Sequence, residues 1–213
     1  MAHEFAEWPK TQRLFRDITV TEKLDGTNAG IHISAVSDMY EAASQYPAES
    51  YSLVVDGVRY VVSAQSRKRL ISPGKTTDNY GFAGWVYDNA DALVRVLGEG
   101  LHFGEWGGQG IQRGYGLDHK RFSLFNTARY VDQFPMLENG MELERGWVDV
   151  VPMLYQGPND TDEVKAQLNS LAKYGSVAAP GWPTPEGVCV YHSASRQVLK
   201  ATLDNHDAGK WEA

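Results

Sequence analysis

A lysine at the end of a predicted strand is the residue of this sequence best suited to covalent chemistry. Lys23 follows an alternating apolar and polar run and comes just before Asp25-Gly26, a strong turn signal. A lysine amine attacks only when neutral, and its ordinary pKa of about 10.4 means that neutralising it near pH 7 costs roughly 4–5 kcal/mol. Burial and nearby cations are the usual causes of such a change. An exposed lysine beside a hairpin turn would show the same residues, so this stretch alone leaves both interpretations open.

The residues around Lys23 predict a hairpin over 17–35. Residues 18–22 form its first expected strand, and residues 29–34 form the second. Gly26 is expected to adopt a positive φ and to let the backbone come close to a ligand. A lysine at such a strand end is presented rigidly.

Three successive cations follow another expected strand, 58–64. Alternation along the chain directs Arg67 and Arg69 to one face and Lys68 to the other. Such clustering suits phosphate binding, because the arginine guanidinium can form bidentate hydrogen bonds to phosphate oxygens. A solvated strand end is the alternative.

Two carboxylates and a second lysine occupy unusual places in apolar strands. Glu105 ends an apolar strand within the glycine-rich stretch 103–113, where a ligand can approach the backbone closely. Its carboxylate could accept ribose hydroxyls or hold a metal, and a flexible hairpin is the alternative. Glu186 stands at the head of another apolar strand. Lys200 interrupts the run 198–201, so it faces a site or a partner charge, or extends from an edge strand to water.

The elements that must position these side chains are mostly strands. Helices are expected over 82–97, capped by Asp88 or Asn89, and after Asn159 or Asp160 for about four turns. In the second helix an inward face and a terminal glycine are expected, formed by Val164, Leu168, Leu171, Ala172 and Gly175. The remaining strands are expected at 101–106, 121–127, 147–154, 186–191 and 197–203, and a loop or a short hairpin is expected around 51–55. Many strands with two or three helices predict one α+β domain with antiparallel sheets flanked by helices.

Length and composition exclude several classes of protein. The 213 residues suffice for one sizeable core, and the formal net charge of −7 argues against broad, non-specific adhesion to nucleic acid. The single cysteine, Cys189, is expected to pack in a core and fits a reducing, cytoplasmic setting. No secretory signal or membrane span is visible. The six histidines lack metal-ligand spacing, and no nucleophile-elbow motif supports Ser/His/Asp hydrolysis.

Six short motifs, in order, resemble the covalent nucleotidyltransferases, the superfamily of ATP-dependent RNA and DNA ligases and mRNA capping enzymes. Within it, the stretch 103–113 followed by Phe-x-x-Phe most resembles the phage RNA ligase 2 group. The resemblance covers residue 17 to the C-terminus, and six motifs in the correct order are far more specific than any one. The matching motifs are Glu22-Lys23-Leu24-Asp25-Gly26-Thr27-Asn28, Ser66-Arg67, Phe103-Gly104-Glu105, Phe122-Ser123-Leu124-Phe125-Asn126, Glu186-Gly187-Val188 and Val198-Leu199-Lys200.

The resemblance implies a role for each matching residue. Lys23 would attack the α-phosphorus of ATP, with Lys200 and Mg²⁺ (or Mn²⁺) neutralising phosphate charge. Arg67 would contact phosphate, Glu186 would help to hold the metal, and Glu105 would bind the ribose. Phe125 would stack on adenine. The other residues implied to line the nucleotide pocket are Glu22, Asp25, Gly26, Thr27 and Asn28.

Three positions differ from the family pattern. The closest group often has histidine where this chain has Asp25, and aspartate is the form common in DNA ligases and capping enzymes. Asn126 replaces a usual aspartate. Thr202 stands where a second lysine is common, so one phosphate-neutralising cation is missing unless another residue, for example Lys210, replaces it.

The resemblance predicts a single nucleotidyltransferase domain over 1–213, without the OB or helical domain that follows in relatives. The expected function is ATP-dependent sealing of 3′-OH/5′-phosphate RNA ends, in a phage-infected or bacterial cell. A DNA ligase or capping-type enzyme is one alternative, and a non-catalytic nucleotide- or RNA-binding module is another. Oligomeric state stays open. Nucleic acid would be held, in a salt-sensitive way, by Arg67, Lys68, Arg69, Lys75, Arg113, Lys120 and Arg121.

Overall fold

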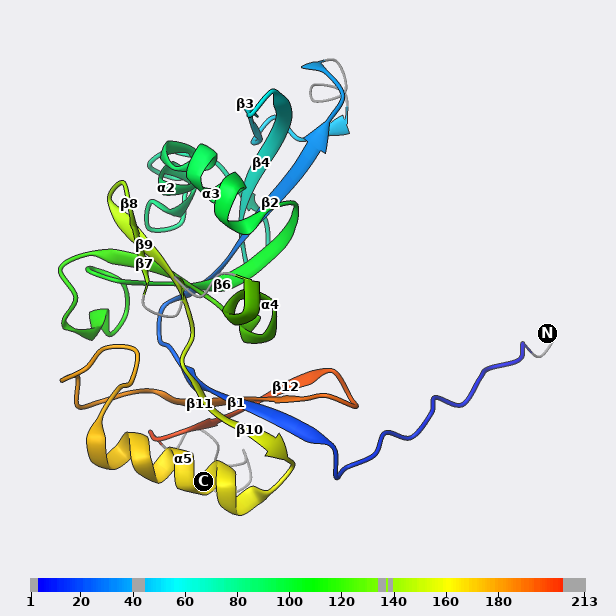
Figure 1. The fold of residues 1–213 in the computed structure, drawn as a ribbon, viewed down its shortest axis with the longest axis vertical. Helices are drawn as coiled ribbons and strands as arrows, with labels where there is room; N and C mark the ends of the chain where they lie inside the picture. The colour runs from blue at the N-terminus through cyan, green and yellow to red at the C-terminus, as the bar shows by residue number, and fades with distance from the viewer. Residues whose placement is uncertain (1–3, 40–44, 134–136, 138–139, 205–213) are drawn as a thin grey trace.

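The protein is described here from a computed structural model, which defines residues 4–39, 45–133, 137 and 140–204. In this part of the chain two β-sheets lie one above the other, with α2 and α3 beside the larger sheet and α5 on the outer side of the smaller one (Figure 1). The smaller sheet has the strand order β10-β1-β11-β12 and the larger one the order β3-β4-β2-β6-β7-β9-β8, with β5 beside β4. Every strand pair is antiparallel except β7 with β9. The predicted α+β class with antiparallel sheets is confirmed.

The strands follow the expected alternation of apolar and polar residues, with shifted ends. The smaller sheet consists of β1 (Asp17–Lys23), β10 (Met153–Pro158), β11 (Gly187–His192) and β12 (Gln197–Thr202). The larger sheet consists of β2 (Thr27–Val36), β3 (Tyr51–Val55), β4 (Val58–Ser66), β5 (Leu70–Ile71), β6 (Gly100–Gly108), β7 (Lys120–Leu124), β8 (Met141–Leu143) and β9 (Gly146–Val150).

The predicted hairpin over 17–35 is wrong. Its two strands exist, but β1 and β2 lie in different sheets: Lys23 pairs with Gly187, whereas Thr27 pairs with Trp106. Alternation reveals a strand but not its partner, and here both partners come from distant parts of the chain. Residues 24–26 therefore connect the two sheets.

A second connection replaces the single strand predicted over 147–154. Val151 and Pro152 separate β9 of the larger sheet from β10 of the smaller one. Proline cannot donate to a strand ladder, which explains the break there. The Val151 N–H donates to Leu124 O, and Pro152 O accepts from the Glu22 N–H, so each residue is bound to a different sheet.

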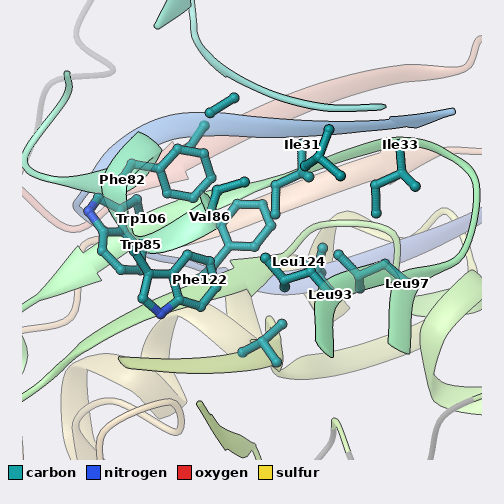
Figure 2. Packing of buried hydrophobic residues seen from close by; sticks show 14 of the residues in the cluster. Ile31, Ile33, Phe82, Trp85, Val86, Leu93, Leu97, Trp106, Phe122 and Leu124 are labelled. Carbon is teal, nitrogen blue, oxygen red and sulfur yellow. The ribbon is translucent and has the colours of Figure 1, made fainter. Parts of the chain in front are cut away.

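The larger core lies between its sheet and two short helices. Helices α2 (Phe82–Asp88) and α3 (Ala90–Leu97) cover one sheet face, where Trp85 packs against Trp106 and Phe122 (Figure 2). The helix predicted within 82–97, with Asp88 or Asn89 at its start, corresponds to α3, and α2 precedes it as a second helix. The Asn89 side chain makes no capping bond; it donates to Trp85 O and Glu144 O instead. It thereby links the helices to the turn between β8 and β9.

The smaller core lies between α5 (Thr161–Tyr174) and the smaller sheet, where Leu171 packs with Val188 and other sheet residues. The Asp160 carboxylate accepts from the Asp162 N–H at 2.8 Å, and Gly175 ends the helix, both as predicted. Ala172 is exposed, so its predicted inward position is wrong.

Two shorter helical segments follow strands of the larger sheet. The 3₁₀ turn η1 (Gly114–Gly116) follows β6, and α4 (Thr127–Gln133) follows β7. None of the helices in the described ranges has the length and apolar character needed to cross a membrane.

Candidate active site

The candidate nucleophile, Lys23, lies at the end of an inner strand of the smaller sheet, beside a carboxylate. Lys23 is the last residue of β1, and its pairing with Gly187 places it beside Glu186, just ahead of β11. Lys23 Nζ is 2.6 Å from Glu186 Oε2, and the two side chains are 23% and 14% exposed. An ion pair is a favourable resting state for this lysine, and attack on an electrophile requires that contact to open.

The larger sheet supplies a second carboxylate across the connection between the sheets. Glu105 of β6 accepts a 3.1 Å hydrogen bond from the Gly26 N–H through Oε1. Burial raises the pKa of Glu105 to about 7, although the nearby charge of Lys23 and the Gly26 N–H oppose that rise. A carboxyl group near half-ionisation at neutral pH, close to a lysine, is typical of a functional site.

Gly26 is needed for a reason other than the predicted one. It is not among the described glycines with positive φ, so the predicted backbone conformation is wrong. A Cβ atom at Gly26 would lie only 2.5 Å from Trp106 O. The absent side chain therefore lets the connection approach β6 and reach Glu105.

Asp25 and Gly26 line a small cavity beside the larger sheet. Its other walls include Leu24, Glu105, Tyr115, Arg121 and Ser123. The Asp25 carboxylate accepts from Arg113 Nε at 3.0 Å, and its backbone N–H donates to Tyr115 Oη at 2.8 Å. The turn after the lysine is thus fixed through both the side chain and the backbone of Asp25.

Glu22, also predicted to line the nucleotide pocket, is not among the residues that line this cavity. Alternation along β1 turns it away from Lys23, and it is buried. Its carboxylate accepts from Ser176 Oγ at 2.6 Å and from the N–H groups of Val177 and Ala178 at 2.8 and 2.9 Å. The Glu22 side chain therefore holds the segment after α5.

Thr27 and Asn28, at the start of β2, are both half-buried near Glu105. Thr27 Oγ1 accepts from Asn79 Nδ2 at 3.0 Å, and Asn28 lies opposite Glu105 in the pairing of β2 with β6. Asn28 is therefore on the same sheet face as Glu105.

The aromatic residue predicted to stack on adenine follows β7. Phe125 is 41% exposed, and its N–H donates to Phe103 O. Its neighbour Asn126 accepts from the Arg129 N–H at 3.2 Å. This bond caps the start of α4, which is what Asn126 does in place of the usual aspartate.

The two predicted phosphate-binding cations lie on different sheets. Arg67 is exposed in the turn between β4 and β5, where its charge still lowers the pKa of Glu105 slightly. Lys200 is exposed on the edge strand β12, opposite Cys189, which in turn pairs with Thr21. Lys200 is therefore on the same face of the smaller sheet as Lys23.

Cys189 does not pack in the core, contrary to the prediction. Alternation places Val188 and Val190 in the core under α5 and turns Cys189 to the face that carries Lys23. Burial raises the pKa of the half-buried Cys189 thiol.

Three of the cations predicted to contact nucleic acid are already engaged. Arg113 binds Asp25, Lys120 Nζ donates to Tyr80 O at 2.7 Å, and Arg121 Nη1 donates to Ala178 O at 2.8 Å. Arg121 also lies 3.4 Å from Asp149, and burial raises the pKa of that carboxyl group. The cations that remain exposed are Arg67, Lys68, Arg69 and Lys75. Lys210 lies outside the described residues.

The carboxylates fit a metal that arrives with a nucleotide. No cluster of three or more histidine, cysteine or carboxylate side chains suited to a metal occurs in the described part of the chain. Magnesium is commonly held by one or two carboxylates together with substrate phosphates, which is the donor set that Glu186 can complete.

A comparison with family models identifies the family to which this chain belongs. The model described as RNA ligase matches residues 16–202, which is nearly the whole chain. The chain belongs to the RNA ligase family. A search of the curated proteins found no match.

Solved RNA ligases from Naegleria gruberi share the fold of this RNA ligase family member. The pyrophosphate complex has a TM-score of 0.51 at 19% identity, covering 89% of this chain and 51% of that one. A variant with ATP and Mn gives a TM-score of 0.50 at 17% identity, covering 89% and 52%, and an apo variant gives 0.50 at 17%, covering 88% and 50%. The chain thus spans about half the length of these ligases.

Two residues that support the candidate site of this RNA ligase family member were not predicted from the sequence. Ser176 binds Glu22 and Tyr115 binds Asp25, on either side of Lys23. Tyr115 lies between two glycines, a local sign of a tight loop, but nothing near it in the sequence indicates that it contacts Asp25, and Ser176 carries no such signal. Arg121, predicted to contact nucleic acid, reaches instead from the larger sheet to the segment after α5.

Proposed function

We propose that this chain is the adenylyltransferase part of an ATP-dependent RNA ligase. The observation that carries the proposal is the position of Lys23, 2.6 Å from Glu186 and just before a turn bound to Glu105. The site unites a candidate nucleophile with carboxylates from two sheets. Membership of the RNA ligase family supports the choice of chemistry.

In the proposed first step Lys23 becomes covalently linked to AMP. The Nζ lone pair forms a bond to the α-phosphorus, the bond to the bridging oxygen breaks, and its electron pair leaves with pyrophosphate. The ammonium form of Lys23 loses two protons to solvent in becoming the phosphoramidate. AMP then passes to an RNA 5′-phosphate, and a 3′-hydroxyl displaces it to form the phosphodiester, steps for which positioning and electrostatics suffice.

The other predicted residues take supporting roles in the proposal. Glu105 binds the ribose, Phe125 stacks on adenine, and Arg67 and Lys200 contact phosphate. Glu186 holds Mg²⁺ or Mn²⁺, which would supply positive charge at the α-phosphate. The Naegleria gruberi RNA ligase variant solved with ATP and Mn supports this choice of nucleotide and metal.

RNA ends or nicks are the proposed substrate, and an intracellular setting fits an ATP-consuming enzyme with one free cysteine. That the domain acts without an attached OB or helical domain stays a prediction. A DNA ligase would prefer a DNA 3′-hydroxyl at a nick, and a capping-type enzyme would use GTP. A binding module would bind ATP without forming the adduct.

Intact mass measured after incubation with ATP and Mg²⁺ tests the proposal. We expect a gain of one AMP that acid removes, present in Lys165→Ala, an exposed control on α5, and absent from Lys23→Ala. The protein is first treated with pyrophosphate to remove AMP already bound. An adduct that persists in Lys23→Ala, or an unchanged mass in the wild type, would contradict the proposal.

A further inference from the structure

Arg113 joins three separate segments of the chain around Lys23 and Glu186. Its Nε lies 3.0 Å from Asp25 Oδ2, and its Nη2 lies 3.0 Å from Asp204 Oδ2. Its Nη1 donates to Thr184 O at 3.0 Å and to Pro185 O at 3.4 Å. All three guanidinium nitrogens are thus engaged, and the side chain is 26% exposed.

Each of these partners adjoins a residue of the proposed chemistry. Asp25 lies two residues after Lys23, and Pro185 comes directly before Glu186. Asp204 follows β12, the strand that carries Lys200. The guanidinium therefore lies where the ends of β1 and β12 meet the beginning of β11.

The loop that carries Arg113 is itself held at two points. Ile111 is fully buried in the larger core, and Tyr115 is buried in a cluster with Leu24 and accepts from the Asp25 N–H. Arg113 thus reaches the smaller sheet from a loop anchored in the larger one. This makes the loop after β6 a rigid support for the turn that follows Lys23.

We infer that Arg113 is a positioning residue, which sets the distance between Lys23 and Glu186 by clamping the segments that carry them. The inference rests on the proposed adenylylation. An arginine suits the task because it stays charged and offers a planar set of donors, whereas lysine offers one compact charge that cannot reach all the partners at once. All three guanidinium nitrogens of Arg113 bind groups of the protein itself, so the proposed clamp acts through the geometry of these segments.

Single-turnover adenylylation of Arg113→Ala and Arg113→Lys tests this role. We expect the maximal rate at saturating ATP to fall by about 100-fold in Arg113→Ala and about 10-fold in Arg113→Lys, because misplacement of reacting groups by about 1 Å has effects of this size. The ATP concentration at half-maximal rate should change less than about threefold. Arg95→Ala is the matched control, because Arg95 also makes two ion pairs, both far from the site.

Hydrogen exchange measured on the same proteins tests the clamp without relying on activity. Arg113→Ala should speed exchange in three segments distant in sequence, 24–26, 184–187 and 202–204, while Arg95→Ala should not. Asp25→Asn should reproduce the effect at 24–26.

The outcomes separate the inference from the proposed function. An unchanged rate in Arg113→Ala, or faster exchange confined to 109–116, would overturn the clamp. A raised half-maximal ATP concentration with an unchanged maximal rate would also overturn it, because Arg113 would then act in nucleotide binding. If the wild type forms no adduct, the proposed function fails, and hydrogen exchange then tests the clamp by itself: unchanged exchange in the three segments of Arg113→Ala would overturn it.

Discussion

Burial sets the ionisation of Glu105. Its pKa, raised from 4.5 to about 7, means that folding favours the protonated carboxyl. The unfolded chain ionises first as pH rises above 4.5, so the stability contributed by this group is fully present below pH 4.5. It is lost as pH rises through about 7. Bound nucleotide would meet a carboxyl group whose charge changes within the physiological range.

Glu105→Gln should remove this pH dependence. The wild type should lose stability relative to Glu105→Gln between pH 5 and pH 8, by at most about 3 kcal/mol for a shift of this size. Urea unfolding of both proteins at the two pH values measures the difference. If the free energies of unfolding of the wild type and Glu105→Gln differ by the same amount at pH 5 and at pH 8, Glu105 titrates normally in the folded protein.

A second buried carboxylate holds a loop instead of a ligand. Glu22→Gln should lower the free energy of unfolding by about 1–3 kcal/mol, because an amide offers one acceptor where Ser176, Val177 and Ala178 donate to two carboxylate oxygens. Denaturant unfolding measures this. Glu163→Gln, a change at a half-buried carboxylate in the first turn of α5, is the control, and an equally small effect in both variants would contradict the role of Glu22.

Among the elements, β6 shows how closely the larger sheet is packed near the site. A Cβ at Gly104 would lie 2.5 Å from Ser123 O and 2.6 Å from Phe122 Cε2. At Gly107 on the same strand the nearest atom would be Gly26 Cα at 3.9 Å, an ordinary contact. Packing therefore excludes a side chain at Gly104 but leaves room for one at Gly107, although both residues belong to β6.

Gly104→Ala should destabilise the protein by about 1–3 kcal/mol, as expected for a side chain forced into a packed core. Gly107→Ala should stay within about 0.5 kcal/mol of the wild type. Thermal and urea unfolding of the pair measure this. Similar losses in both variants would mean that strand propensity, and not packing, explains the effect.

For the whole molecule, the central fact is that the chain passes between the sheets at residues 24–26 and again at 151–152. The segment 176–178 adds a side-chain link, because Glu22 binds it from the smaller sheet and Arg121 binds it from the larger one. Lys23 and Glu105 are thereby held on facing elements. We expect the two sheets to unfold together.

RNA binding should depend on the few exposed cations and not on the engaged ones. Replacing Arg67, Lys68 and Arg69 with alanine should reduce the slope of log affinity against log salt by about 0.7–0.9 for each phosphate that these side chains neutralise in the wild type. Fluorescence anisotropy with a nicked RNA duplex at several salt concentrations measures the slope. Lys120→Ala is the control, since its ammonium already binds Tyr80 O. Salt-insensitive binding by the wild type would contradict an electrostatic interface.

The sequence by itself determined the strands, the long helix and its caps, and the residues of the motifs. These follow from local rules: apolar alternation, a capping aspartate at position 160, and a glycine at position 175. The motifs also indicated Lys23, Glu105 and Glu186 together, because their order along the chain is itself a signal. The family match bears out the resemblance that these motifs carry.

Only the tertiary structure decided which strands pair and which charges are free. Lys23 and Gly26 are close in sequence, yet the first belongs to β1 and the second contacts β6, because strand pairing depends on residues far along the chain. Arg113 was expected to meet nucleic acid, but Asp25, 88 residues away, accepts its hydrogen bond. A charged side chain shows its partner only when the chain is folded, since the partner's distance in space bears no relation to its distance in sequence.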